Sequence, residues 1–220
     1  MKKAIKWKEL APTTLVFVAL LALIFWWVNR SLKTDGQEVD ALFKKVATVY
    51  PSLSVEIHES ETYFPCIIGN IRGTNVHFHH GYKGRGGNRK DYLYAEFWTD
   101  QTINTARWFS LTESGFTISD SQKGLKQDIL HQGLQELYTL KDRDTSFAQP
   151  IFTGQLAETL LNLNAKGGFG EIFLNEGNLK FMRIPYPQNP SEEDVLQLRN
   201  ILELGVALQA QILVRDQGAL

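Results

Sequence analysis

The chain has 220 residues, with 23 lysines and arginines, 24 aspartates and glutamates, five histidines and one cysteine. The formal net charge of −1 excludes the strong basic excess that is typical of a dedicated nucleic-acid-binding protein. A single cysteine excludes an internal disulfide framework and any multi-cysteine zinc or iron–sulfur site. Hydrophobic residues make up 43% of the chain, which is enough to bury the core of one globular domain with an appendage.

The first element in the chain is an apolar segment. Residues 13–28 contain no charged side chain, and Leu10, Ala11 and Pro12 extend the segment to 10–28. As a helix it would measure roughly 28 Å, close to the ~30 Å hydrocarbon core of a bilayer. The segment ends in bulky and then basic residues, whereas a signal-peptidase site needs small ones. The sequence therefore predicts an uncleaved, single transmembrane anchor.

Charge on either side of the anchor predicts its orientation. Residues 1–9 contain four lysines, which favour a cytoplasmic N-terminus and place the rest of the chain on the outer, periplasmic face. Without these nine residues the chain has 19 basic and 23 acidic residues, a net charge of −4, so it has no general attraction to DNA or anionic lipid. The expected organisation is a basic flank (1–9), an anchor (10–28), a short linker (29–36), a soluble α+β domain (37–214) and a tail (215–220).

The first half of the domain reads as a helix followed by strands. A helical pattern over 37–50 stops at Pro51, and alternation predicts a strand at Leu53–Ile57. Residues 66–72 and 75–79 predict a hairpin that turns at Gly73–Thr74. Aromatic and β-branched residues predict three more strands, which we expect to continue an antiparallel meander: 92–99, 106–112 and 116–119.

The second half predicts helices interleaved with strands. We expect a helix over 123–132, a strand over 135–140 and a helix over 154–164 that ends at Gly167–Gly168. Strands at 171–174 and 179–184 flank a turn at 175–178, and Ser191 with Asp194 forms a capping-box-like start to a long amphipathic helix. The predicted fold class is α+β, with a mostly antiparallel sheet, packed helices and a long C-terminal helix after the transmembrane helix.

A short histidine pattern is the first candidate site. His77 and His79 point to one face of a strand and His80 points to the other. Two imidazoles at this spacing could share Zn²⁺ or Cu²⁺ with a third ligand such as His58 or Glu59. The alternative is a solvated strand end, because H-x-H alone is a weak motif.

The glycine-rich stretch that follows is the second candidate. Backbone amides around Gly84, Gly86 and Gly87 could hold an anion or a lipid headgroup, with charge from Lys83, Arg85 and Arg89. The stretch lacks the spacing of a phosphate loop and of a dinucleotide fingerprint. The alternative is a hairpin tip whose charges aid solubility.

Catalytic motifs are absent from the sequence. Cys66 could act as a nucleophile only beside a base such as His77 or His79, and such a cysteine is more often a small buried residue. The acidic residues are scattered and give no carboxylate pair. We therefore predict no catalytic residues and no cofactor, and we keep a membrane-tethered hydrolase using Cys66 or scattered carboxylates as a third alternative.

The order of elements from Ile67 to Leu213 resembles that of a broad class of membrane-anchored bacterial proteins. The residues that carry the resemblance are Gly69, Gly73 and Val76, and later Asp144–Phe147. It implies a membrane-associated domain and supplies no catalytic residues.

The sequence thus favours a membrane-anchored, non-enzymatic accessory or scaffold protein. Its expected partners are the lipid bilayer, through residues 10–28, and a membrane protein or further copies of the chain, with no nucleic acid. Residues 81–90 are the predicted contact tip. The main alternative is a membrane-tethered module that binds a metal through His77 and His79 or an anionic ligand through Lys83, Arg85 and Arg89.

Overall fold

The computed structural model describes residues 7–57, 65–83, 90–114, 125–143, 147–165, 170–187 and 189–218. The side chains of residues 7–15, 28–36, 82 and 83 also lie outside this description. The predicted strand at 116–119 and the predicted helix stop at Gly167–Gly168 fall on residues that are not described.

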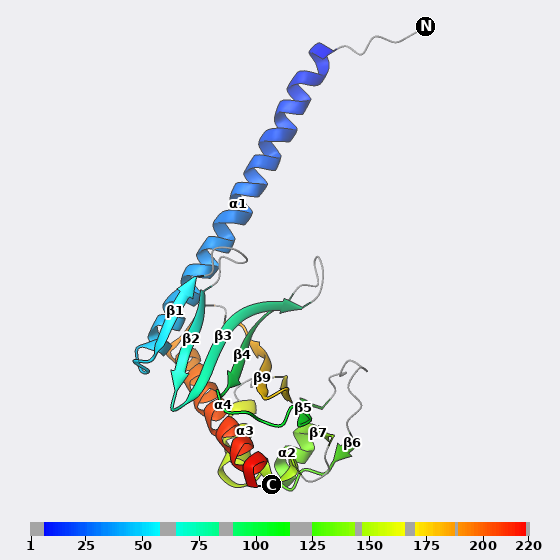
Figure 1. Cartoon of the computed structure of the whole chain (residues 1–220). Coiled ribbons are helices and arrows are strands. Elements are labelled where there is room, and N and C mark those ends of the chain that lie inside the picture. Colours follow the sequence, from blue (N-terminus) through cyan, green and yellow to red (C-terminus); the bar gives the residue numbers. More distant parts are fainter. Residues whose placement is uncertain are drawn as a thin grey trace.

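The longest element near the N-terminus is α1 (Trp7–Ala47), a single helix of 41 residues. Its N-terminal half extends away from the rest of the chain (Figure 1). The predicted linker, residues 29–36, is therefore helical and joins the apolar segment to the domain without a break. The large apolar side chains from Val16 to Trp27 are all between 51% and 69% exposed. Among the residues whose side chains are described, no helix combines the length and mean hydropathy of a membrane span.

The described residues form one nine-stranded antiparallel sheet, which confirms the predicted α+β class. Its strands, in chain order, are β1 (Leu53–Ile57), β2 (Pro65–Ile71), β3 (Thr74–Lys83), β4 (Lys90–Trp98), β5 (Trp108–Glu113), β6 (Leu125–Gln127), β7 (Tyr138–Asp142), β8 (Glu171–Asn175) and β9 (Asn178–Pro185). In space the order is β1-β2-β3-β4-β9-β8-β5-β7-β6. The predicted meander is therefore wrong after β4, because the late β8–β9 hairpin lies between β4 and β5.

Two tight hairpin turns have the backbone that a two-residue connection requires. Arg72 and Gly73 have φ of 51° and 85°, and Glu176 and Gly177 have φ of 52° and 79°. Positive φ at both central residues matches the right-handed twist of the flanking strands, and glycine adopts it without strain. The first turn lies one residue earlier than predicted, because Thr74 is buried and already belongs to β3.

Helices cover one face of the sheet. The C-terminal part of α1 packs on β1 and β2, α4 (Glu192–Gly218) packs on β3, β4 and β9, and α3 (Gly154–Asn164) packs on α4. Edge-to-face phenylalanine pairs join the layers and the strands, with ring centroids 5.4–5.7 Å apart: Phe43–Phe78, Phe97–Phe181 and Phe109–Phe152. The core is therefore one continuous apolar layer between the sheet and the helices.

Three local predictions need correction. The helix expected over 123–132 is wrong, because residues 125–127 form strand β6 against β7. The strand expected over 135–140 begins only at Tyr138, since residues 132–137 form the short helix α2 (Gln132–Leu137). Residues 215–218, expected to be a tail, continue α4. In each case pairing or packing with a distant element decides the local structure.

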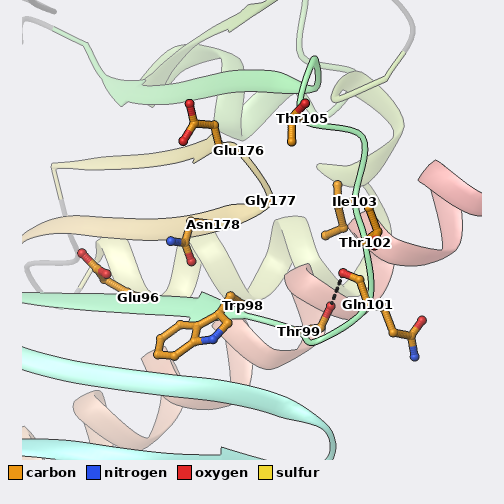
Figure 2. Close-up of a pocket in the computed structure, with 10 residues that line it drawn as sticks. All are labelled: Glu96, Trp98, Thr99, Gln101, Thr102, Ile103, Thr105, Glu176, Gly177 and Asn178. Carbon is orange, nitrogen blue, oxygen red and sulfur yellow. Dashed lines mark hydrogen bonds between the residues drawn. The ribbon is translucent and has the colours of Figure 1, made fainter.

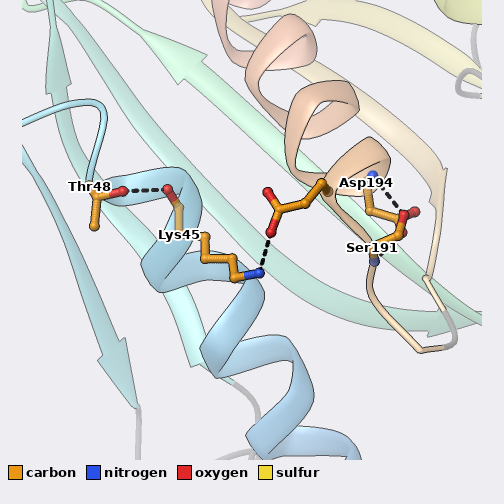
Figure 3. Close-up of polar contacts among 5 residues, drawn as sticks. Lys45, Thr48, Ser191 and Asp194 are labelled. Carbon is orange, nitrogen blue, oxygen red and sulfur yellow. Dashed lines mark hydrogen bonds and ion pairs between the residues drawn. The ribbon is translucent and has the colours of Figure 1, made fainter.

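The start of α4 confirms the predicted capping box. The backbone N–H of Asp194 donates to Ser191 Oγ at 3.3 Å, and the backbone N–H of Ser191 donates to Asp194 Oδ2 at 2.7 Å. Beside this cap, Lys45 Nζ on α1 lies 2.5 Å from Glu192 Oε1 (Figure 3). The N-terminus of α4 is thus fixed both internally and to the end of α1.

Candidate functional site

The face of the sheet opposite the helices is only partly covered by the described residues. We call this surface the open face and define it by its half-buried side chains: Ile68, His77, His79, Tyr94, Glu96, Trp98, Phe173 and Lys180. Register places His77 opposite Glu96 and His79 opposite Tyr94 on neighbouring strands. The open face therefore brings aromatic, imidazole and charged groups together in the middle of the sheet.

The two predicted histidines lie together on the open face. The rings of His77 and His79 stack with centroids 4.7 Å apart, and the ring of His79 stacks on Tyr94 at 5.6 Å. His80 lies on the opposite face with its side chain buried, as the strand pattern predicts. Within the described residues, no group of three or more histidines, cysteines, aspartates and glutamates could hold a metal ion. His58 and Glu59 lie outside the description, so the metal site remains a prediction.

Glu96 forms the centre of a polar network on the open face. Lys180 Nζ donates to Glu96 Oε1 at 2.7 Å, and His79 Nε2 lies 3.9 Å from the same oxygen. His79 and Lys180 lower the pKa of Glu96 to about 2, although partial burial of the carboxylate opposes the shift. Glu96 is therefore charged throughout the physiological pH range and is unsuited to general acid–base catalysis there.

Cys66 lacks the environment of a nucleophile. Its side chain is buried, and Sγ donates to the backbone carbonyl oxygen of Glu56 at 3.5 Å. Burial, together with the charge of Glu56, raises the pKa of the thiol. Cys66 is therefore a protonated thiol at neutral pH, whereas a catalytic cysteine needs a lowered pKa.

The predicted anion-binding loop cannot be built from the described residues. Lys83 ends β3, its side chain lies outside the description, and so do residues 84–89 with Arg85 and Arg89. Lys90 is exposed at the start of β4. Contact of this loop with an anion or a headgroup remains a prediction.

A cleft that the sequence did not predict lies at the end of β4. Segment 99–107 leaves β4 and crosses the end of the β8–β9 hairpin to reach β5, so two distant parts of the chain meet there (Figure 2). The cleft encloses about 440 Å³ and is lined by Glu96, Trp98, Thr99, Gln101, Thr102, Ile103, Thr105, Glu176, Gly177 and Asn178. Sequence reasoning missed it because the crossing exists only if β8 and β9 insert between β4 and β5.

Polar contacts to α4 hold the walls of the cleft. Asp216 Oδ2 accepts from the backbone N–H of Asn104 at 2.9 Å, and Asp216 Oδ1 accepts from Arg107 Nε at 3.2 Å. On the other wall, Gln209 Nε2 donates to the carbonyl oxygen of Gly177 at 3.1 Å. Ile103 is buried against this turn. Both walls are therefore fixed to the same helix.

Two non-glycine residues, one in the β8–β9 turn and one within β9, adopt positive φ. Glu176 has φ of 52° in the β8–β9 turn, and Arg183 has φ of 60° where the register of β9 against β4 shifts opposite Tyr94. Such backbone is unfavourable for residues with a Cβ, and bulges of this kind re-aim side chains. The bulge at Arg183 thus lies opposite Tyr94 of the open face.

Comparisons with known proteins do not assign the chain to a family. No protein-family model matches the chain, and no curated protein matches it. The crystal structure of the mycobacterial trehalose monomycolate transport factor A, TtfA, aligns with 77% of this chain and 94% of its own, at 9% sequence identity and a TM-score of 0.49. We draw no functional conclusion from a likeness at this identity and TM-score.

Proposed function

We propose that the chain is a membrane-anchored, non-enzymatic accessory protein whose open face contacts an integral membrane protein. The observation that carries the anchoring is the row of large apolar side chains from Val16 to Trp27, which are exposed on every side of α1. A helix that is apolar all round is suited to a hydrocarbon environment. The basic flank, residues 1–9, favours the outer face of the membrane for the domain.

The continuity of α1 supports a scaffold role. At about 1.5 Å per residue, the eleven steps from Val28 to Val39 place the first core position of α1 only about 16 Å beyond the apolar segment. Val39 and Phe43 are fully buried in the domain, and Lys45 pairs with Glu192 of α4. A helical connection with a buried end holds the domain at one height and orientation above the bilayer, which a flexible linker would not do.

The chemistry of the open face supports contact with a protein. Half-buried aromatic groups such as Tyr94 and Trp98 are enriched in protein interfaces. The central charge, Glu96, is already paired with Lys180, so covering this surface leaves no unpaired carboxylate. Neither Cys66 nor Glu96 has a pKa suited to catalysis at neutral pH, which favours a binding role over hydrolysis.

Native mass spectrometry of the full-length protein, gently extracted from its own membrane, tests the proposal. We expect an assembly that contains a second membrane polypeptide. A photo-crosslinking residue at Tyr94 should capture that polypeptide, whereas the same residue at Leu196, exposed on α4, should not. A bare monomer or homodimer, or equal capture from both positions, would overturn the proposal.

A further inference from the structure

Seven of the ten residues that line the cleft at the end of β4 are polar, and one is a large aromatic residue. Trp98 provides the ring, and the polar groups are two carboxylates, two carboxamides and three hydroxyls: Glu96, Glu176, Gln101, Asn178, Thr99, Thr102 and Thr105. Planar carboxylates accept hydrogen bonds in pairs, and carboxamides both accept and donate them. Such groups suit a ligand with several neighbouring hydroxyls.

The charge of the cleft argues for a neutral ligand. No lysine or arginine is among its ten lining residues, which disfavours an anion. Glu96 is ionised, but its charge is balanced by Lys180, which donates to Oε1. Oε2 of the same carboxylate can then accept a hydrogen bond from a neutral ligand. Only Glu176, exposed at the turn, adds a negative charge that has no ion-pair partner among the described residues, and this is a weak attraction for a cation in solvent.

Trp98 and Asn178 supply complementary features within the cleft. Figure 2 shows Trp98 and Glu96 extending from β4 with Asn178 beside them on β9. A half-buried indole at the surface offers a flat apolar face for the C–H groups of a sugar ring and an N–H donor at its edge. Asn178 Oδ1 is buried and has no hydrogen-bond partner within the described part of the chain. A ligand hydroxyl that donates to it would relieve the cost of an unsatisfied buried acceptor.

The walls of the cleft are fixed before a ligand arrives. Asp216 holds the segment 99–107 at two points, and Gln209 holds Gly177 of the opposite wall. Preorganised walls reduce the conformational entropy that a ligand must remove on binding. The volume of about 440 Å³ lies within the usual range for small-molecule sites.

From these observations we infer that the cleft binds a neutral carbohydrate, with one sugar ring stacked on Trp98. Glu96 Oε2, Asn178 and the threonine hydroxyls bond the ring hydroxyls. The site has room for about one or two rings. This inference does not rest on the proposed anchoring. The cleft shares Glu96 and Trp98 with the open face, so a bound sugar would occupy one end of the surface that we propose contacts a protein.

Isothermal titration calorimetry on the full-length protein tests the inference. The protein is placed in nanodiscs of phosphatidylethanolamine and phosphatidylglycerol, which avoid sugar-based detergents and choline. The probes are maltose, cellobiose and N,N′-diacetylchitobiose, with choline chloride as a cation and glucose 1-phosphate as an anion. We expect at least one disaccharide to bind with a Kd of about 0.1–1 mM.

Three variants assign the binding to the cleft. Trp98→Ala should weaken the affinity at least about tenfold, and Trp98→Phe should keep most of it because an aromatic platform remains. Asn178→Ala should weaken it by roughly three- to tenfold. Tyr92→Ala is the matched control, because Tyr92 is also half-buried on the same side of β4 but does not line the cleft. Thermal unfolding of each variant verifies that β4 still folds.

Several results would overturn the inference. One is the absence of binding by all three disaccharides at concentrations up to about 20 mM. Another is binding of choline or glucose 1-phosphate alone. A third is a disaccharide affinity that Trp98→Ala and Asn178→Ala leave unchanged, or that Tyr92→Ala weakens equally.

Discussion

Lys180 on β9 donates a 2.7 Å hydrogen bond to Glu96 on β4, across 84 positions of sequence. The pair forms where the late β8–β9 hairpin joins the first four strands, and His79 on β3 approaches the same carboxylate. Polar contacts on the open face therefore connect three strands from two distant parts of the chain. The pairing also keeps Glu96 ionised, and Glu96 is one of the residues that line the cleft.

Replacing Glu96 with glutamine should make stability less dependent on pH. The pKa of Glu96 is about 2 in the folded chain and near its ordinary value of 4.5 when unfolded. The contribution of the ionised carboxylate to the free energy of unfolding is therefore complete above about pH 5 and is lost as the pH falls toward 2. We expect Glu96→Gln to cost about 1 kcal/mol at pH 7, allowing for solvent screening, and almost nothing near pH 2.

Thermal unfolding of both proteins between pH 2.5 and pH 7 measures this difference. Glu176→Gln is the control, because Glu176 is exposed and forms no ion pair with the described residues. A difference in Tm between the parent and Glu96→Gln that stays constant with pH would show that the network does not set the charge of Glu96.

Gly205 allows α4 to lie directly on β4. A Cβ at this position would lie 2.1 Å from Cζ of Phe97, a fully buried ring. In an isolated helix, alanine is favoured over glycine by about 1 kcal/mol. We nevertheless expect Gly205→Ala to destabilise the domain by about 2–3 kcal/mol, because the helix must move or the ring must leave its rotamer.

A double-mutant cycle isolates the steric clash. Phe97→Leu removes the ring, so Gly205→Ala should cost much less in that background, with a coupling of about 1–2 kcal/mol. Ala207→Gly, on an exposed position of the same helix, should cost about 1 kcal/mol and reports helix propensity alone. If Gly205→Ala raises Tm, the close approach of α4 to Phe97 is incorrect.

Asp216 fixes the wall of the cleft, although its charge destabilises the end of its own helix. A carboxylate in the last turn of α4 is unfavourable by about 0.3–1 kcal/mol, because the C-terminus of a helix carries partial negative charge. Yet Asp216 and Arg107 are only 11% and 16% exposed and are paired. We expect Asp216→Ala to cost about 2 kcal/mol and to speed amide hydrogen exchange in segment 99–107.

The exposed pair on α1 provides the comparison for Asp216. Lys44 Nζ lies 2.6 Å from Oδ2 of Asp40, one helical turn away. Asp40→Ala should lower the free energy of unfolding by no more than about 0.5 kcal/mol. Equal losses of stability in the two variants, with unchanged hydrogen exchange at 99–107, would contradict an anchoring role for Asp216.

The parts of the fold that could be predicted are those that short-range chemistry decides. Helix α3 matches its predicted bounds, and the capping box at Ser191 and Asp194 has the expected bonds. The positions of His77, His79 and His80 in the strand correctly predicted which face of the sheet each side chain lies on, because strand geometry has a period of two. Both tight turns were predicted at their glycines, the first of them one residue too late.

The parts that could not be predicted depend on long-range pairing. Residues 125–127 look helical in sequence, but β7 supplies hydrogen-bond partners that make them a strand. Nothing local indicates that β9 pairs with β4, and the cleft beside Trp98 exists only because of that pairing. The polar composition of 29–36 suggested a linker, although most polar residues are compatible with a helix and α1 continues through them.

The apolar part of α1 leads to the last prediction. Leu20 and Leu23 lie near the middle of residues 10–28 and are 53% and 60% exposed. An arginine at the centre of a membrane-embedded helix costs about 2.5–3.5 kcal/mol on insertion scales. Neither position contacts the core of the domain, so a substitution there should change membrane binding without changing the folding of the domain.

We therefore expect the double variant Leu20→Arg, Leu23→Arg to leave the membrane fraction after a carbonate wash, while the unfolding temperature of its domain stays within about 2 °C of the parent. Leu196→Arg with Val214→Arg is the control, since both residues are exposed apolar positions on α4. That control should remain in the membrane, because α4 belongs to the domain. Retention of the α1 variant in the washed membrane would refute anchoring by this segment, since two arginines near its centre are incompatible with a span. Release of both variants would point instead to general unfolding or aggregation, and a lowered unfolding temperature would reveal it.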